Sequence, residues 1–262
     1  MKPSVNIVKI GGKVIENIET LQLFLRDFSH IKGPKILVHG GGRTATELAA
    51  KLGIASQMIE GRRITDMPTL EIVTMVYGGL VNKNIVATLQ AVGCNALGLT
   101  GADMNCILAE KRNPVPIDYG FVGDIVAVNA IAFSQLLQQG ITPVLAPLTH
   151  NKNGQLLNTN ADTIAAQVAV ALSKSFEVTL SYCFEKKGVL HNVNDDDSVI
   201  DLINETDFAQ MKVAGSIADG MIPKLDNAFA TLRAGVEKVQ IMHHTAVQHI
   251  GTSAFTGTTL CL

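Results

Sequence analysis

The stretch SVNIVKIGGKVI, residues 4–15, decides how the rest of the chain is interpreted. Apolar residues surround Lys9, and Gly11 and Gly12 then end the apolar run. This pattern predicts a buried strand that enters a glycine turn. Open α/β sheets bind ligands at the carboxyl ends of their strands, and glycine lets backbone N–H groups approach phosphate oxygens. We therefore predict that Lys9 and this first glycine turn (residues 11–12) hold a phosphoryl group.

A second stretch, PKILVHGGG, repeats the same device. A buried strand is expected at residues 35–38, and it ends in Gly40, Gly41 and Gly42. A helix is expected at residues 44–52. Because helix N-termini carry unpaired N–H groups and a positive dipole end, this second glycine turn (residues 40–42) also favours an anion.

The remaining chain alternates between apolar strands and amphipathic helices. This alternation predicts an α/β fold, a three-layer αβα sandwich with a mainly parallel central sheet that is covered on both faces. The expected helices are at residues 18–28, 69–90, 131–138, 161–172, 207–213 and 222–233. The expected strands are at residues 96–99, 141–148, 176–184 and 236–243, with an edge segment or hairpin at 120–128 and a short strand or loop at 60–66.

Composition excludes several classes of protein. The 262 residues carry a formal net charge of −2, which argues against a nucleic-acid or polyanion partner. No apolar run of membrane-spanning length and no signal peptide is apparent, so we expect a cytoplasmic protein. The cysteines are scattered without CxxC spacing and predict reduced structural thiols; they are Cys94, Cys106, Cys183 and Cys261.

Two common nucleotide-binding motifs are absent. Neither IGGK nor HGGGRTA has the G-x-G-x-x-G spacing of a dinucleotide-binding turn. A P-loop needs Ser or Thr after its lysine, but Val14 follows Lys13. Each glycine turn taken alone could be an ordinary structural turn.

Charged residues together with the two glycine turns indicate a function more specifically than either turn alone. Asp162 lies near a helix start, where it could also be a simple helix-terminal acid or a cap. Lys224 lies near another helix start, an unusual position for a cation because helix N-termini favour anions. Lys9 and Lys224 with Asp162 and two glycine turns supply what phosphoryl transfer needs, namely charge neutralisation and in-line positioning. The structural alternative is a solvated Lys224 and a structural Lys9.

These motifs together resemble those of bacterial N-acetylglutamate kinases of the amino acid kinase family. The resemblance covers essentially the whole chain and rests on KIGGK from Lys9, VHGGG from Val38, GRRIT from Gly61, NTNAD from Asn158 and DGMIPK from Asp219.

The resemblance implies a role for each residue. Lys9 would lie near the β–γ bridge of ATP and Lys224 on the nucleotide side, with Asp162 orienting both. Gly11 and Gly12 would cradle the β- and γ-phosphates.

On the acceptor side, Gly41 and Gly42 would receive the γ-carboxylate of the substrate. Arg63 would bind its α-carboxylate through the guanidinium fork, and Asn158 its acylamide. The neighbouring Arg62 has the simpler interpretation of a surface charge.

The chemistry implied is direct transfer to a carboxylate, giving an acyl phosphate. A carboxylate is already a nucleophile at neutral pH, so no general base is required. The cofactor would be ATP with Mg²⁺ held mainly by the phosphates, and no metal site built from protein residues is expected.

The resemblance also implies an organisation. Residues 1–173 would form an N-terminal lobe for the acylated glutamate and for dimerisation, and residues 174–262 a nucleotide-binding lobe within one continuous fold. We expect a homodimer with the helix at 69–90 in the interface. Relatives inhibited by arginine carry an extra N-terminal helix, whereas eight residues precede Lys9 here, so we expect insensitivity to arginine.

Some features depart from the family or leave alternatives open. Glu185, in FEKKG, stands where relatives often have aspartate, which leaves the adenine and ribose contacts undefined. A surface or structural role is expected for His243, His244 and His249 rather than a metal site. The acceptor could also be an N-succinylated glutamate, aspartate, glutamate, carbamate or uridylate. Alternatively, the chain could be a catalytically silent sensor of amino acids or nucleotides.

Overall fold

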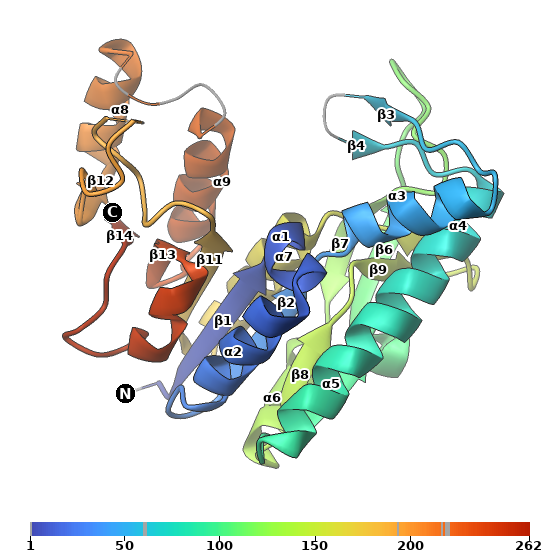
Figure 1. The fold of residues 1–262 in the computed structure, drawn as a ribbon, viewed down its shortest axis with the longest axis horizontal. Helices are drawn as coiled ribbons and strands as arrows, with labels where there is room; N and C mark the ends of the chain where they lie inside the picture. The colour runs from blue at the N-terminus through green and yellow to red at the C-terminus, as the bar shows by residue number, and fades with distance from the viewer. Residues whose placement is uncertain (1, 60–61, 193, 216, 218–220) are drawn as a thin grey trace.

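The central feature of the fold is an eight-stranded sheet (Figure 1). The structure is a computed structural model that describes residues 2–59, 62–192, 194–215, 217 and 221–262. Across the sheet, the strands are β12 (Leu202–Asn204), β14 (Thr258–Cys261), β13 (Lys238–His243), β11 (Glu177–Phe184), β1 (Ser4–Ile10), β2 (Lys35–His39), β8 (Thr142–Leu145) and β5 (Ala96–Leu99).

The six strands from β13 to β5 are parallel. The predicted αβα sandwich is confirmed by the alternation of side chains along β1, since Ile7 enters the hydrophobic core on one face of the sheet and Val8 the core on the other. Both residues are fully buried, as expected for a strand covered on both faces.

Helices cover each face of this sheet (Figure 1). One layer contains α2 (Ile18–Ser29), α3 (Gly42–Lys51) and α5 (Asn82–Ala91), which supply buried residues to one core. The other contains α6 (Ala130–Gln138), α7 (Ala161–Ser173), α8 (Glu205–Val213) and α9 (Ile222–Arg233).

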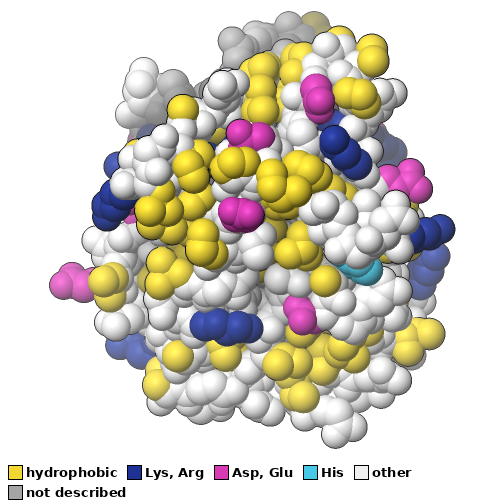
Figure 2. Space-filling model, turned by 90° about the vertical axis from the view of Figure 1, so that its right-hand side faces the viewer, with side chains coloured by type: hydrophobic (Ala, Val, Ile, Leu, Met, Phe, Trp, Pro, Cys, Tyr) yellow, Lys and Arg dark blue, Asp and Glu magenta, His cyan; other side chains and the backbone are white. Residues whose placement is uncertain are grey.

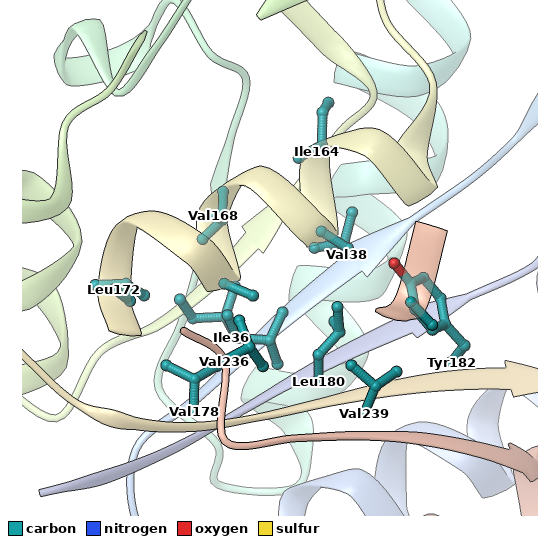
Figure 3. Packing of buried hydrophobic residues seen from close by; sticks show 14 of the residues in the cluster. Ile36, Val38, Ile164, Val168, Leu172, Val178, Leu180, Tyr182, Val236 and Val239 are labelled. Atoms are coloured by element: carbon teal, nitrogen blue, oxygen red, sulfur yellow. The ribbon is translucent and has the colours of Figure 1, made fainter. Parts of the chain in front are cut away.

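Helix α7 shows why the sequence forms this layer. Ile164, Val168 and Leu172 recur every four residues and are fully buried against the sheet (Figure 3). Burial of each such side chain contributes roughly 1.5–3 kcal/mol. This packing fixes the N-terminus of α7 at the carboxyl edge of β1 and β11, where ligands bind in open sheets.

The predicted helix at residues 69–90 is confirmed as a continuous helical segment of three parts, which we call the long helix. Its parts are α4 (Met67–Val73), the π-helical segment η1 (Thr74–Val81) and α5. Gly78 and Gly79 do not interrupt it but lie within its π-helical part.

The long helix also corrects the prediction about membrane spans. Among the described residues, it is the one helix whose length and composition would allow it to cross a membrane. Nearly half of its most apolar window is buried inside the protein, and core helices commonly meet the same criteria.

Four short strands were not predicted as such. They form a second sheet with the order β10 (Leu156–Asn158), β9 (Leu148–His150), β6 (Ile107–Lys111) and β7 (Gly123–Val128). The strand predicted at 141–148 is in fact divided between β8 and β9, because the chain leaves the main sheet around Pro147. The hairpin interpretation of residues 120–128 is partly right, since β7 pairs antiparallel with β6.

Three parts of the sequence predictions need separate mention. The final strand β14 was missed, and it runs antiparallel to β13. Gly61, Asp219 and Gly220 of the motif stretches lie outside the described residues. The cysteines are free thiols, as predicted.

His39, the last residue of β2, is fully buried and fully hydrogen-bonded. Its Nδ1 lies 2.7 Å from the carbonyl oxygen of Gly40, so Nδ1 carries the proton and donates. Its Nε2 then accepts from Asn82 Nδ2 at 3.1 Å. Burial is the main cause that lowers the pKa of His39 to about 4.

This pKa predicts how the free energy of unfolding depends on pH. In the unfolded chain His39 takes up a proton below its ordinary pKa of 6.5, whereas in the folded protein it stays neutral down to about pH 4. Stability is therefore lost as pH falls from 6.5 to 4, by up to about 3 kcal/mol from this group. Urea unfolding of wild type and His39→Gln across this range should show a shallower pH dependence in the variant. Parallel curves would contradict the prediction.

Candidate active site

The two glycine turns lie side by side at the carboxyl edge of the sheet. Gly11 precedes the short helix α1 (Gly12–Glu16), and Gly41 is the N-cap of α3. A β-carbon built on Gly40 would lie 3.9 Å from the backbone nitrogen of Gly12. Two helix N-termini thus present backbone N–H groups to one region, as the sequence predicted for anion binding.

Gly41 can only be glycine. Its φ of +150° is a backbone conformation that other residues rarely adopt. A β-carbon there would lie 2.9 Å from Cδ1 of Tyr77, which is closer than real contacts allow. The close approach of this turn to the long helix therefore depends on the missing side chain.

Lys9 and Asp162 form an ion pair at the centre of this edge. The Lys9 ammonium lies 2.7 Å from Asp162 Oδ1, and the Lys9 side chain is only 11% exposed. Asn160, rather than Asp162, caps α7, because its side-chain oxygen accepts from the backbone N–H groups of Asp162 and Thr163. The Asp162 carboxylate is therefore available to pair with Lys9.

Lys224 lies in the first turn of α9 and faces the same charges. Its ammonium lies 4.0 Å from the centroid of the Phe184 ring, a cation–π contact. Burial lowers the pKa of Lys224, the Asp162 carboxylate opposes that change, and Lys9 adds to it. The three predicted catalytic residues are thus brought together.

A cavity of about 530 Å³ opens beside them. Gly41, Gly42, Arg63, Asn158 and Asp162 all line it. Its size suits a small metabolite.

The other predicted site residues, Lys9, Lys224, Gly11 and Gly12, are not among the residues that line this cavity. Lys9 reaches it through Asp162, and Gly12 through its neighbour Gly40.

Arg63 is buried and anchored beneath the second glycine turn. Its Nη2 donates to the carbonyl oxygen of Gly42 at 2.8 Å and to Thr46 Oγ1 at 2.7 Å, and its Nη1 donates to Ser56 Oγ at 2.8 Å. It lies on β4 (Arg62–Arg63), which pairs with β3 (Met58–Ile59). These bonds fix the direction of the guanidinium fork.

Asn158 ends β10 and is held by a residue close to Arg63 in the chain. Its Nδ2 donates to Thr65 Oγ1 at 3.0 Å. Because Thr65 follows Arg63 by two residues, Asn158 and Arg63 belong to the same end of the cavity.

Sequence reasoning missed several residues that line the cavity, among them Tyr77, Arg112 and Tyr182. Tyr77 gave a partial signal, since the helical period placed it on the apolar side of the long helix. Arg112 belongs to no sequence motif. Its side chain forms an ion pair with Asp124 and lines the cavity. Arg62 is exposed, as predicted, yet it also lines the cavity.

Glu185 and two of the histidines named in the sequence analysis have identifiable partners. Glu185 forms an ion pair with Lys13, which follows the first glycine turn. The rings of His243 and His244 lie 4.0 Å apart, and burial lowers the pKa of both. Within the described part of the chain, no group of three or more His, Cys, Asp and Glu side chains could hold a metal ion.

The motifs and the geometry have clear counterparts in known proteins. Residues 4–243 match the model of the amino acid kinase family. The chain belongs to the amino acid kinase family. It is 59% identical over 250 residues to the acetylglutamate kinase of Parabacteroides distasonis, a match that covers 95% of this chain and 98% of the relative.

Solved structures of the same fold are more distant in sequence. The Neisseria gonorrhoeae N-acetylglutamate synthase complexed with coenzyme A and N-acetyl-glutamate has a TM-score of 0.84 at 23% identity. That match covers all of this chain and 60% of the longer synthase chain. Giardia lamblia carbamate kinase bound to AMP-PNP has a TM-score of 0.71 at 13% identity, covering 99% of this chain and 98% of that chain.

The anchoring of Arg63 predicts a selective defect on its removal. If Arg63 binds the α-carboxylate as predicted, Arg63→Ala should raise the KM for an N-acylated glutamate far more than the KM for ATP, because that contact and the hydrogen bond to Gly42 would both be lost. Loss of one charge-assisted contact costs on the order of 2–3 kcal/mol. Steady-state kinetics would measure this, with the exposed Arg43→Ala, which removes an ion pair to Glu16, as the control. An unchanged acceptor KM in folded Arg63→Ala would contradict the assignment.

Proposed function

We propose that this chain transfers the γ-phosphoryl group of ATP to the γ-carboxylate of N-acetyl-L-glutamate, the second step of arginine biosynthesis. The observation that carries the proposal is the Lys9–Asp162 ion pair, with Lys224 beside it and two adjoining glycine turns at the same edge of the sheet. The similarity to acetylglutamate kinases over nearly the whole chain supports the choice of substrate.

Each glycine turn would position one of the two reactants. The first turn would bind the β- and γ-phosphates through the N–H groups of Gly11 and Gly12. The second would bind the reacting carboxylate through Gly41 and Gly42. Because the turns adjoin, donor and acceptor would meet in line, and positioning of this kind accounts for much of phosphoryl-transfer catalysis.

At the acceptor end, Arg63 would bind the α-carboxylate and Asn158 the acylamide of the substrate. Both line the cavity next to the second glycine turn. With two anchors and the turn, the substrate would be held at three points, which leaves its γ-carboxylate directed at the phosphoryl group.

The charged residues would stabilise the transition state. Negative charge moves toward the leaving ADP as the phosphoryl group transfers, and the ammonium groups of Lys9 and Lys224 would interact with that charge more strongly than with the ground state. Asp162 holds Lys9 and influences Lys224 electrostatically. No residue needs to abstract a proton, since the acceptor is an ionised carboxylate.

Magnesium would accompany ATP. The donor set fits an ion held by phosphate oxygens, because Asp162, the predicted catalytic carboxylate, is already paired with Lys9. The ion would add positive charge to that of the two lysines.

Residues 1–173 would form the acceptor lobe, residues 174–262 would bind the nucleotide, and the enzyme would act in the cytoplasm.

We also propose that the enzyme is a homodimer that pairs through the long helix. Figure 2 shows hydrophobic side chains gathered on the face at the right of Figure 1, the side on which α4 lies. Met67, Met75 and Leu80 of this helix are each more than 40% exposed. Exposed apolar patches of this kind mark protein interfaces.

A dimer of this kind makes a measurable prediction. Light scattering should give twice the chain mass of 27.9 kDa. The double variant Met75→Glu, Leu80→Glu should shift the protein toward monomers, because charge is placed on a desolvated surface. An unshifted mass would argue against this face, and a hexamer or inhibition by millimolar arginine would contradict the assembly proposed.

The catalytic roles predict a loss of turnover rather than of acceptor binding. Lys9→Ala and Lys224→Ala should each lower kcat by roughly 10²–10³-fold, with little change in KM for the carboxylate substrate. Lysine-to-arginine variants should recover little activity, since a planar fork does not replace a compact ammonium. The double variant should lose less than the product of the two, because the residues share Asp162.

A coupled ADP-release assay measures all of this. It should first be run on wild type with N-acetylglutamate, N-succinylglutamate, glutamate and aspartate, and N-acetylglutamate should be the preferred acceptor. Circular dichroism confirms that each variant is folded. Normal turnover by a folded Lys224→Ala enzyme would overturn its catalytic role, and absence of ADP release with every acceptor would favour a silent sensor.

A further inference from the structure

The second glycine turn is linked to the long helix at two points: the π-helical part contacts it directly, and Asn82, the first residue of α5, reaches it through His39. The first is Tyr77, which is buried against Gly41. A β-carbon on Gly41 would lie 2.9 and 3.2 Å from two atoms of its ring, and one on Gly42 would lie 3.9 Å from its hydroxyl. Burial raises the pKa of Tyr77, and the positive charge of the nearby Arg63 opposes that rise.

The second link is Asn82, which is 1% exposed and reaches the turn only through His39. Its Nδ2 donates to His39 Nε2 at 3.1 Å and to the carbonyl oxygen of Val144 at 2.9 Å. Its Oδ1 accepts from Lys83 Nζ at 3.1 Å. His39 in turn donates to Gly40, so a satisfied buried network runs from the helix to the first residue of the turn.

The π-helical geometry explains how one helix makes both contacts. The backbone N–H of Asn82 donates to the carbonyl oxygen of Tyr77, five residues earlier. In an α-helix, residues five apart differ in direction by about 140°, because each residue turns the helix by about 100°. A π-helical i→i+5 bond instead brings such residues toward the same side, and π segments are frequent at functional sites.

We propose that Tyr77 and Asn82 are positioning residues that hold the second glycine turn in the conformation that receives the acceptor carboxylate. The proposal rests on the function proposed above. Neither residue needs to touch the reacting atoms: Tyr77 supports Gly41 and Gly42 by contact, and Asn82 supports Gly40 through His39. Displacement of a positioning group by about 1 Å can cost roughly 10²-fold in rate.

The test uses variants that alter each contact separately. Tyr77→Leu removes the ring that lies on Gly41, Tyr77→Phe keeps it, and Asn82→Ala removes the donor to His39. The matched control is Val76→Ala, a buried residue of the same π-helical segment. Calorimetric titration measures the Kd for N-acetyl-L-glutamate, the ADP-release assay gives kcat and the KM for ATP, and thermal unfolding gives Tm.

A positioning role predicts a distinctive pattern. Tyr77→Leu and Asn82→Ala should weaken acceptor binding and lower kcat by about tenfold or more each, while the KM for ATP stays within about twofold. Tyr77→Phe should recover most of both. Val76→Ala should lower Tm through the lost packing without changing acceptor affinity.

Contrary outcomes separate this inference from the proposed function. Wild-type acceptor affinity and turnover in folded Tyr77→Leu would overturn the inference, even if Asn82→Ala does not fold. Equal acceptor defects in Val76→Ala would also overturn it, because they would show a general softening of the helix. Failure of the wild-type enzyme to bind or phosphorylate N-acetyl-L-glutamate would instead overturn the proposed function, and this inference with it.

Discussion

The ion pair between Lys9 and Asp162 is the interaction on which the site depends. It joins the central strand of the sheet to the first turn of α7, and it neutralises an ammonium group that is almost wholly buried. A buried charge without its partner costs on the order of 3–5 kcal/mol. The packing of α7 and the capping by Asn160 therefore stabilise the buried lysine indirectly, because they hold the Asp162 carboxylate next to its ammonium group.

The surroundings of this pair are built from backbone more than from side chains. Gly40 and Gly12 approach closely enough that two helix N-termini share one space, and Gly41 adopts a conformation that side chains resist. Such turns have little stability of their own, since glycine loses much conformational entropy on folding. The second glycine turn gains its rigidity from neighbours, namely Arg63 on one side and the long helix on the other.

The sequence predicted the features that have a local cause. The strand–glycine–helix units, the helix with Ile164, Val168 and Leu172, and the cluster of Lys9, Asp162 and Lys224 all follow from period, turn chemistry or motif. Features that depend on partners far away in the chain could not be predicted from the sequence. Strand β14 is recognisable only by its pairing with β12 and β13, and Arg112 only by its ion pair. The side chain of Asn82 likewise has a distant hydrogen-bond partner, His39, which lies 43 residues earlier.

The pairing of β1 with β11 has a consequence for how the chain is made. Strand β1 begins at Ser4, yet one of its two neighbours in the sheet lies more than 170 residues later, and Lys2 donates to the carbonyl oxygen of Ser173. On a ribosome that adds about 5–20 residues per second, the first strand would wait roughly ten seconds or more for this partner. The nascent chain therefore carries an open hydrophobic edge for most of its synthesis, and non-local pairing of this kind slows folding and invites aggregation. The geometry that places Lys9 between β11 and β2 therefore leaves the first strand without one neighbour until most of the chain has been made.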